Sequence, residues 1–170
     1  MRKEKPIKLG IIKDDKLTKQ SDSALWNFDR TLRIFLRDSL RKFAESCDSY
    51  PVCFNDNWEL MATEEWEKRD KNKDYYKAWV DHLNEITNKL DYSLSDAWEI
   101  LTEEDNDFLK TYYMKYPSFK SVTNPDTVEK EDIERRNEIW DKVDKEEDKR
   151  RAAAKEALDD IKKILFDLWN

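Results

Sequence analysis

The side chains best suited to chemistry are four arginines that recur at three- and four-residue steps within one strongly helical segment. They are Arg30, Arg33, Arg37 and Arg41. Because an α-helix turns about 100° per residue, these positions share one side of the helix, here called the arginine face. Trp26 falls on the same side. Guanidinium groups beside an indole suit a phosphate or carboxylate ligand, through bidentate hydrogen bonds and stacking.

Two interpretations of the arginine face are open. In the first, Trp26 and the four arginines bind a small anionic ligand of the nucleotide type. In the second, the arginines pair with surplus Asp and Glu side chains of neighbouring helices. Because Trp26 and Ile34 are seldom left fully exposed, we expect this face to be covered by another helix, a second subunit or a partner.

Other groups with catalytic potential are few. His82 is the only histidine, and it lies at the edge of an apolar stripe, which favours a structural role. Carboxylates gather at one predicted helix start, namely Glu103, Glu104, Asp105 and Asp107. An EF-hand loop needs a glycine and regular ligand spacing, and neither is present here. We therefore predict a solvated acidic helix start, with no metal, no cofactor and no catalytic residue.

The two cysteines, Cys47 and Cys53, are six residues apart. This spacing fits no standard zinc pattern, and a single histidine offers little help as a further ligand. We expect two buried, reduced thiols.

A single glycine among 170 residues indicates the fold class. Sheet proteins use glycine at hairpin turns, and phosphate-binding loops use it where the backbone approaches the ligand. Charged residues make up 42% of the chain, but seven Trp, seven Tyr and seven Phe argue against disorder. The sequence predicts an all-α protein, a single-domain helical bundle with a long C-terminal helix and an extended N-terminal arm.

The net charge of -7 is unevenly distributed. Residues 1–20 carry seven Lys and Arg against three Asp and Glu, so we expect a basic N-terminal arm there and a helical domain over 21–170. Within the arm, residues 7–12 suit a short strand or an extended segment in a groove. The acidic remainder disfavours duplex nucleic acid as a ligand. The absence of a signal peptide and of a long apolar run predicts no membrane insertion.

Apolar residues at helical spacing predict a first helix that is capped within residues 21–23 and ends near Ser46, before a turn at Tyr50-Pro51. Its stripe consists of Leu25, Phe28, Leu32, Phe35, Leu36, Leu40 and Phe43. Residues 54–73 give a weak signal for short helical turns. A second helix is predicted from Asp74, with Tyr76, Trp79, Val80, Leu83, Ile86 and Leu90 on one side.

A third helix is predicted with Ser93 or Ser95 as its N-cap and with its end at Tyr116-Pro117. Thr102 and Asp105 have the spacing of a capping box that interrupts this helix. Its apolar positions are Trp98, Leu101, Phe108, Leu109, Tyr112 and Tyr113. Residues 117–127 are predicted to form a loop.

From Thr127 onward a long helix is predicted. A heptad seam is indicated by Ile133, Trp140, Val143, Ala154, Ala157, Ile161, Ile164 and Leu168. Eight consecutive charged residues, 144–151, place Glu147 and Arg150 on this seam, so the helix either leaves the core there or breaks. We favour a continuous, solvent-bridging helix, because no Gly or Pro interrupts it. The apolar end of the chain is expected to dock on the core or to form a homo-oligomer seam.

Two stretches together resemble a widespread group of small uncharacterised bacteriophage proteins. The first runs Trp26-Asn27-Phe28-Asp29-Arg30-Thr31-Leu32 and on to Tyr50-Pro51, and the second is Leu165-Phe166-Asp167-Leu168-Trp169. The match covers about a third of the chain, and Ser49 stands where the group usually has glycine. The resemblance implies a phage origin and a helical fold, and it lends no activity. Within the motif, Asp29 is expected to pair with an arginine, and Asn27 to form a hydrogen bond with a neighbouring helix terminus. Trp169 is expected to pack near these residues.

These observations favour binding over catalysis. We expect a non-catalytic phage protein in the host cytoplasm that antagonises a host defence or host process. It would block a host protein with its acidic surface, or sequester a small anionic signal at the arginine face. The alternative is a structural or virion-associated component that forms homo-oligomers through its C-terminal helix.

Overall fold

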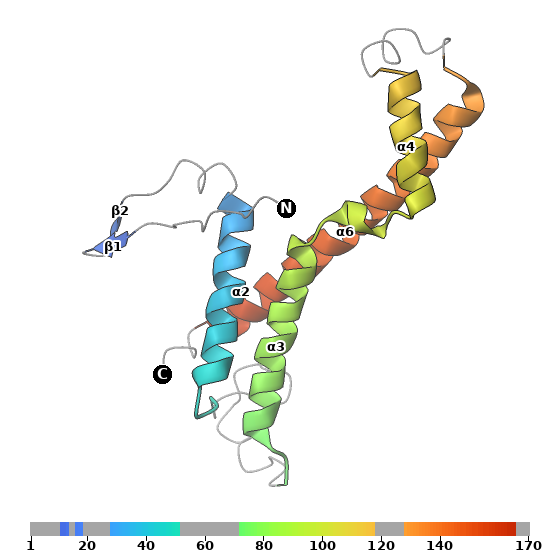
Figure 1. Ribbon diagram of the computed structural model, residues 1–170. Coiled ribbons are helices and arrows are strands. Elements are labelled where there is room, and N and C mark those ends of the chain that lie inside the picture. Colours follow the sequence, from blue (N-terminus) through green and yellow to red (C-terminus); the bar gives the residue numbers. More distant parts are fainter. Residues whose placement is uncertain (1–10, 14–15, 19–27, 52–71, 118–127, 166–170) are drawn as a thin grey trace. The chain divides into compact units, whose positions relative to one another are not determined.

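The computed structural model describes residues 11–13, 16–18, 28–51, 72–117 and 128–165. Helices dominate these residues, and the longest is the C-terminal one, so the predicted all-α class with a long C-terminal helix is confirmed (Figure 1). The elements are β1 (Ile11–Lys13), β2 (Lys16–Thr18), α2 (Phe28–Ser46), α3 (Tyr75–Leu94), the 3₁₀ helix η2 (Ala97–Ile100), α4 (Glu103–Lys115) and α6 (Lys130–Ile164).

The chain divides into two compact units. Unit 1 consists of Met1–Leu94 and Ala153–Asn170, and unit 2 of Ser95–Ala152. Helix α6 contributes to both units, because it runs without a break from Lys130 to Ile164. The prediction that residues 21–170 form one domain stays a prediction.

Within the predicted arm, β1 and β2 form a two-stranded antiparallel hairpin in which Ile12 pairs with Leu17. Of residues 7–12, for which a short strand or an extended segment was expected, Ile11 and Ile12 belong to β1, and residues 7–10 lie outside the described residues. The predicted boundary between arm and domain, at residues 20–21, lies outside the described residues.

The core of unit 1 is formed by α2, α3 and the last turns of α6. Its buried side chains are Leu40, Ala44, Trp79, Leu83, Ile86, Leu90, Ala157, Ile161 and Ile164. The predicted stripe of α3 is largely confirmed, although Tyr76 is exposed. Asp74 starts this helix, because its Oδ1 accepts a hydrogen bond from the backbone N–H of Lys77.

The apolar stripe predicted for α2 is only partly buried. Leu40 is in the core, but Phe28 and Phe35 are 53% and 49% exposed. The buried side of α2 lies between the predicted apolar stripe and the arginine face, because α3 packs against the arginines as well as against Leu40. The ends predicted near Ser46 and at Tyr116-Pro117 are confirmed, while residues 19–27 and 52–71 lie outside the described residues.

Unit 2 is built from η2, α4 and the first part of α6 around Ala97, Leu101, Leu109, Ile139 and Val143. The predicted capping box is confirmed, since the Thr102 hydroxyl accepts from the Asp105 N–H and the Asp105 carboxylate accepts from the Thr102 N–H. The prediction that Ser93 or Ser95 starts this segment is wrong. Asp96 caps η2 instead, because its carboxylate reaches the backbone N–H of Trp98.

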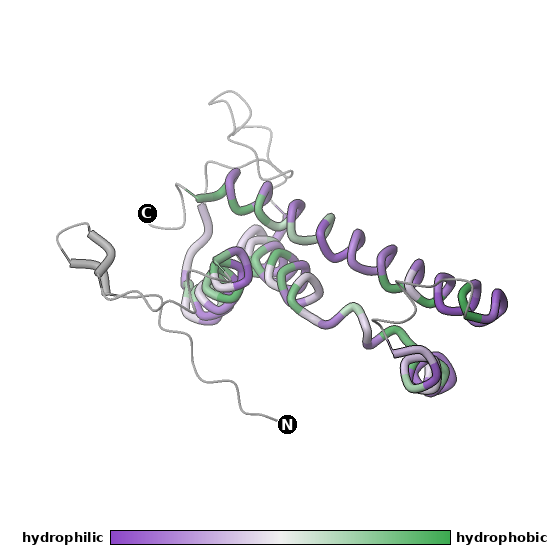
Figure 2. Tube along the Cα trace, turned by 90° about the horizontal axis from the view of Figure 1, so that it is seen from above, coloured by the Kyte–Doolittle hydropathy of each residue, from purple (hydrophilic) through white to green (hydrophobic). Residues whose placement is uncertain are grey.

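The prediction that α6 is continuous is confirmed, but two residues of its charged run are buried. Glu146 and Arg150 form an ion pair one helical turn apart, with 3.3 Å between Oε1 and Nη2, and Arg150 also donates to the Ser95 hydroxyl. Glu147, which the heptad pattern placed on the seam, is half-buried and pairs with Arg151. Figure 2 shows the resulting hydrophilic stretch between the apolar turns of α6. Among the described residues, no helix has the length and hydrophobicity that crossing a bilayer requires.

Candidate functional site

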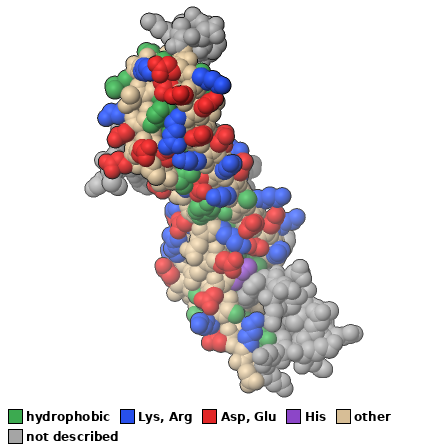
Figure 3. Space-filling view, turned by 90° about the vertical axis from the view of Figure 1, so that its right-hand side faces the viewer, with side chains coloured by type: hydrophobic (Ala, Val, Ile, Leu, Met, Phe, Trp, Pro, Cys, Tyr) green, Lys and Arg blue, Asp and Glu red, His purple; other side chains and the backbone are tan. Residues whose placement is uncertain are grey.

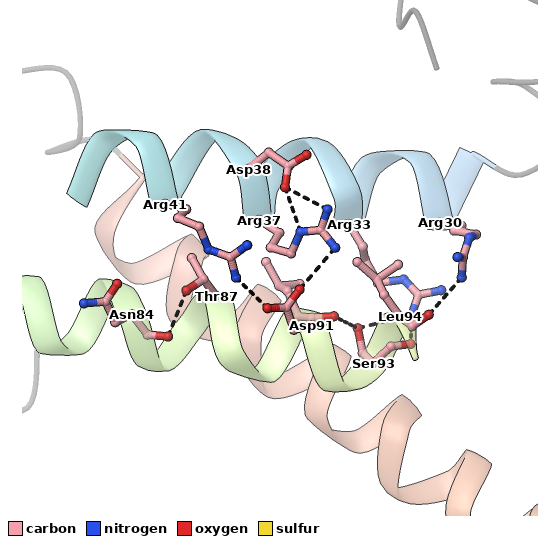
Figure 4. Close-up of polar contacts among 11 residues, drawn as sticks. Arg30, Arg33, Arg37, Asp38, Arg41, Asn84, Thr87, Asp91, Ser93 and Leu94 are labelled. Carbon is pink, nitrogen blue, oxygen red and sulfur yellow. Dashed lines mark hydrogen bonds and ion pairs between the residues drawn. The ribbon is translucent and has the colours of Figure 1, made fainter. Parts of the chain in front are cut away.

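The arginine face of α2 lies against the C-terminal half of α3 (Figure 4). Arg30 donates from Nη1 to the carbonyl oxygen of Leu94 at 3.0 Å, and Arg33 donates from Nη1 to that of Ser93 at 2.8 Å. The last carbonyls of a helix have no partner within the helix and carry its negative dipole end. These two guanidinium groups therefore compensate the C-terminus of α3.

The other two arginines meet a carboxylate of α3. Arg37 Nη1 lies 3.1 Å from Asp91 Oδ1, and Arg41 Nη2 lies 2.5 Å from Asp91 Oδ2. Arg37 also contacts Asp38 at 2.7 Å, and this hydrogen bond is the largest cause that raises the pKa of Arg37 further. One carboxylate thus joins two successive turns of the arginine face to α3.

The four arginines accordingly make the contacts expected from the second interpretation, pairing with a neighbouring helix. Their partners are carbonyl oxygens as well as acids. The helix that covers this face is α3, as Figure 4 shows. Trp26, the indole that the first interpretation requires, lies outside the described residues. A ligand role for the arginine face stays a prediction.

The residues of the two motif stretches are placed in part. Asp29 pairs with Arg33 one turn later, at 2.9 Å, so the expected pairing with an arginine is confirmed. A hydrogen bond from the backbone N–H of Arg30 and the contact with Arg33 lower the pKa of Asp29. Tyr50 stacks on Tyr75 with ring centroids 5.9 Å apart, and Pro51 is half-buried. The predicted contacts of Asn27, Asp167 and Trp169 lie outside the described residues.

His82 is half-buried beside Trp79, with ring centroids 6.2 Å apart. Burial lowers its pKa, because the charged imidazolium loses hydration there. Cys47 carries a free thiol that donates to the Ala44 carbonyl, and burial raises its pKa. Cys47 is half-buried rather than buried, and Cys53 lies outside the described residues.

The carboxylates at the start of α4 do not act as one solvated cluster. Glu103, Glu104 and Asp107 are exposed, but Asp105 is buried, which the sequence analysis did not predict. Asp105 accepts from Arg135 at 2.8 Å and from Lys142 at 3.1 Å. Burial raises its pKa, but the hydrogen bonds from Lys142 and Thr102 outweigh burial, and the pKa is lowered. Among the described residues, no group of three potential metal ligands comes together.

An exposed aromatic pair in unit 2 was not predicted. Trp98 of η2 and Trp140 of α6 meet edge to face, with centroids 5.0 Å apart and an interplanar angle of 85°. They are 36% and 38% exposed. The heptad pattern placed Trp140 on the buried seam, but Ile139 and Val143 occupy it, and Trp140 is turned about 100° from Ile139. The sequence did contain a sign of this arrangement. Ile139 stands four residues before Val143, so the two side chains lie on the same side of the helix.

The negative charge of the chain is concentrated in unit 2. Residues 95–152 hold 17 Asp and Glu against 11 Lys and Arg, a net charge of -6, which leaves -1 for unit 1. Figure 3 shows a face on which acidic and basic side chains are interspersed with hydrophobic groups. The charge difference between the units lets unit 2 attract a cationic partner more strongly than unit 1 does.

Comparison of the chain with protein-family models, curated proteins and solved structures gives no match.

Proposed function

We propose that this chain is a non-catalytic phage protein that acts by binding a host protein, as an antagonist of a host defence or host process. The observation that carries the proposal is the concentration of negative charge in unit 2, beside exposed aromatic side chains. Acidic surfaces accelerate encounter with basic partners and disfavour phosphate-bearing ones. The phage-like motif supplies the biological setting.

The contacts of the arginine face favour a protein partner over a sequestered anion. Each of its four guanidinium groups already donates to α3 or to a carboxylate of α2. An anion would have to displace these contacts and leave Asp91 and the carbonyls of Ser93 and Leu94 without their donors. For the carbonyls of Ser93 and Leu94, which belong to buried residues, such a loss costs about 1–3 kcal/mol each.

The oligomeric alternative has less support. Its predicted seam includes Ala157, Ile161 and Ile164, and these side chains are buried in the core of unit 1, against α3. A seam that is filled within one chain offers little surface to a second copy.

Affinity capture tests the proposal. The full chain is immobilised and exposed to a lysate of the host, and captured proteins are identified by mass spectrometry and then purified for calorimetry. A host protein that binds the purified chain stoichiometrically, with affinity that falls as salt rises, is the expected result. If the chain captures no host protein and nucleotides release heat on titration, the anion version replaces this proposal.

A further inference from the structure

We infer that Trp98 and Trp140 anchor a docking surface on unit 2 for a basic, arginine-bearing segment of a partner protein. The inference rests on the proposed function and deepens it. The tryptophan surface is defined as the pair itself, Ile100 in the same 3₁₀ turn, and three acidic neighbours. These neighbours are Glu99, Asp141 and Asp144.

The pair is not needed to fill the interior of unit 2. The core beneath it is formed by Ala97 and Leu101 of the same segment and by Ile139 and Val143 of α6. The two indoles keep 36% and 38% of their surface in contact with solvent, and Ile100 keeps 40%. These three large apolar side chains of η2 and α6 are therefore exposed, in addition to Tyr113 and Met114 of α4.

The geometry suits an interface anchor. The edge-to-face contact fixes both rings, so little side-chain freedom remains to be lost when a partner binds. Tryptophan is among the residues most enriched where truncation weakens binding strongly, and it presents a large area with only two rotatable bonds. An exposed and already ordered indole pair has these properties before any partner arrives.

The surrounding charge selects the kind of partner. Asp144 lies one turn beyond Trp140 on α6 and so shares its side of the helix. Arg136, one turn before Trp140, shares this side too, but its guanidinium stacks on the Tyr112 ring and donates to the Tyr112 hydroxyl. Glu99 and Asp141 directly follow the two tryptophans and lie on adjoining sides of their helices. All three carboxylates are exposed, and none of them forms an ion pair with any residue in the described parts of the chain. By contrast, Asp105 and Asp132 in the same unit are paired with cations.

An arginine side chain can contact both kinds of group on this surface, the indole rings and the carboxylates. Its guanidinium stacks on an indole face through a cation–π contact and donates paired hydrogen bonds to a carboxylate. Phosphate groups of a nucleic acid or of an anionic membrane would instead meet uncompensated carboxylates. We therefore commit to a basic protein segment as the occupant.

A defined peptide provides the probe. The isotope-labelled full chain is titrated with a short peptide of repeated Arg-Leu-Ser, and the indole N–H signals are followed by NMR after assignment by single Trp→Phe substitutions. The signals of Trp98 and Trp140 are expected to shift, while the other assigned indoles move little. A peptide of repeated Glu-Leu-Ser is the charge control and is expected to leave all signals in place.

Substitutions locate the contact. Trp98→Ala with Trp140→Ala is expected to weaken binding of the Arg-Leu-Ser peptide by about tenfold or more. Met114→Ala is the matched control, because Met114 is a large apolar side chain of unit 2 that is 71% exposed, and it is expected to bind as wild type does. Asp144→Asn, which leaves both indoles in place, is expected to weaken binding by a few-fold. Circular dichroism checks that each variant keeps its helix content.

The outcomes separate this inference from the proposed function. Equal affinity of the double variant and wild type, or shifts at other indoles only, would overturn the docking surface. If a host protein captured by wild type is captured equally by a folded double variant, the proposed function stands and the tryptophan surface is wrong. If wild type captures no host protein but the peptide binds at these indoles, the proposed function fails and the surface remains.

Discussion

The guanidinium of Arg33 on α2 donates to the carbonyl oxygen of Ser93, 2.8 Å away, in the last turn of α3. It also reaches the Ser93 hydroxyl at 3.3 Å and the carboxylate of Asp29 at 2.9 Å. An arginine from one helix thus caps the carboxyl end of another, where a glycine-based cap is common in other proteins. In a chain with a single glycine, side-chain donors take over this task.

Removal of this cap is expected to destabilise unit 1. Arg33→Met keeps much of the aliphatic stem but leaves the Ser93 carbonyl without its donor, so unfolding should become easier by about 1–2 kcal/mol. Urea denaturation followed by circular dichroism measures the change. Arg151→Met serves as the control, because Arg151 is 73% exposed and its pairs are on the surface. Equal losses in the two variants would contradict a capping role for Arg33.

The buried pair on α6 gives a second prediction. Glu146→Gln leaves the Arg150 cation buried without its charge partner and is expected to cost about 3 kcal/mol. The double replacement Glu146→Leu with Arg150→Met removes both charges and is expected to recover most of that loss. Thermal unfolding of wild type, Glu146→Leu, Arg150→Met and their double variant forms a double-mutant cycle. Additive losses would show that the two side chains act independently.

The buried carboxylate of Asp105 predicts that the free energy of unfolding decreases at low pH. The folded protein lowers the pKa of Asp105 below its ordinary value of 3.8, so the carboxylate binds its proton less readily when folded than when unfolded. Its stabilising contribution is fully present above about pH 4 and is lost as the pH falls through the lowered pKa. Asp105→Asn should reduce stability near neutral pH and flatten the acid limb. Urea unfolding midpoints of the variant and wild type, measured at several pH values from about 2 to 7, test this prediction.

His82 predicts a second change of stability with pH, at a higher pH than the change that Asp105 causes. Burial lowers the pKa of His82 below 6.5, so the unfolded chain takes up a proton before the folded one does. Stability is therefore complete above about pH 6.5 and decreases as the pH falls towards the lowered pKa. His82→Gln removes the titrating group and should flatten this part of the curve. Titration of the His82 ring protons by NMR provides a direct check, and a midpoint above 6.5 would contradict the assignment.

The helices and their caps were largely predictable, because periodicity and capping are local properties of the sequence. The capping box of Thr102 and Asp105 and the buried Ala157, Ile161 and Ile164 followed from spacing alone. Burial on the flanks of a stripe was not predictable in the same way. Trp140 lies one position from Ile139, and only the packing of η2 and α4 against α6 decides which of the two is inside.

The sequence predicted which residues form the candidate site, but not which groups these residues contact. The sequence placed four arginines on one side of α2, but it could not tell whether α3 or a ligand would meet them. That outcome depends on contacts between residues that are 50 or more positions apart, such as Arg41 and Asp91 or Arg33 and Ser93. The tryptophan surface was missed for the same reason, because Trp98 and Trp140 come together only in three dimensions.

Because α6 serves both units, the order of synthesis imposes an order of assembly. Unit 2 is continuous in the chain, from Ser95 to Ala152, and all of it is synthesised before Ala157, Ile161 and Ile164. Unit 1 has to wait for those three side chains, so α2 and α3 emerge early with part of their core still open. Where unit 2 already holds the first turns of α6, completing unit 1 requires only that this helix be extended, and helix extension is much easier than nucleation.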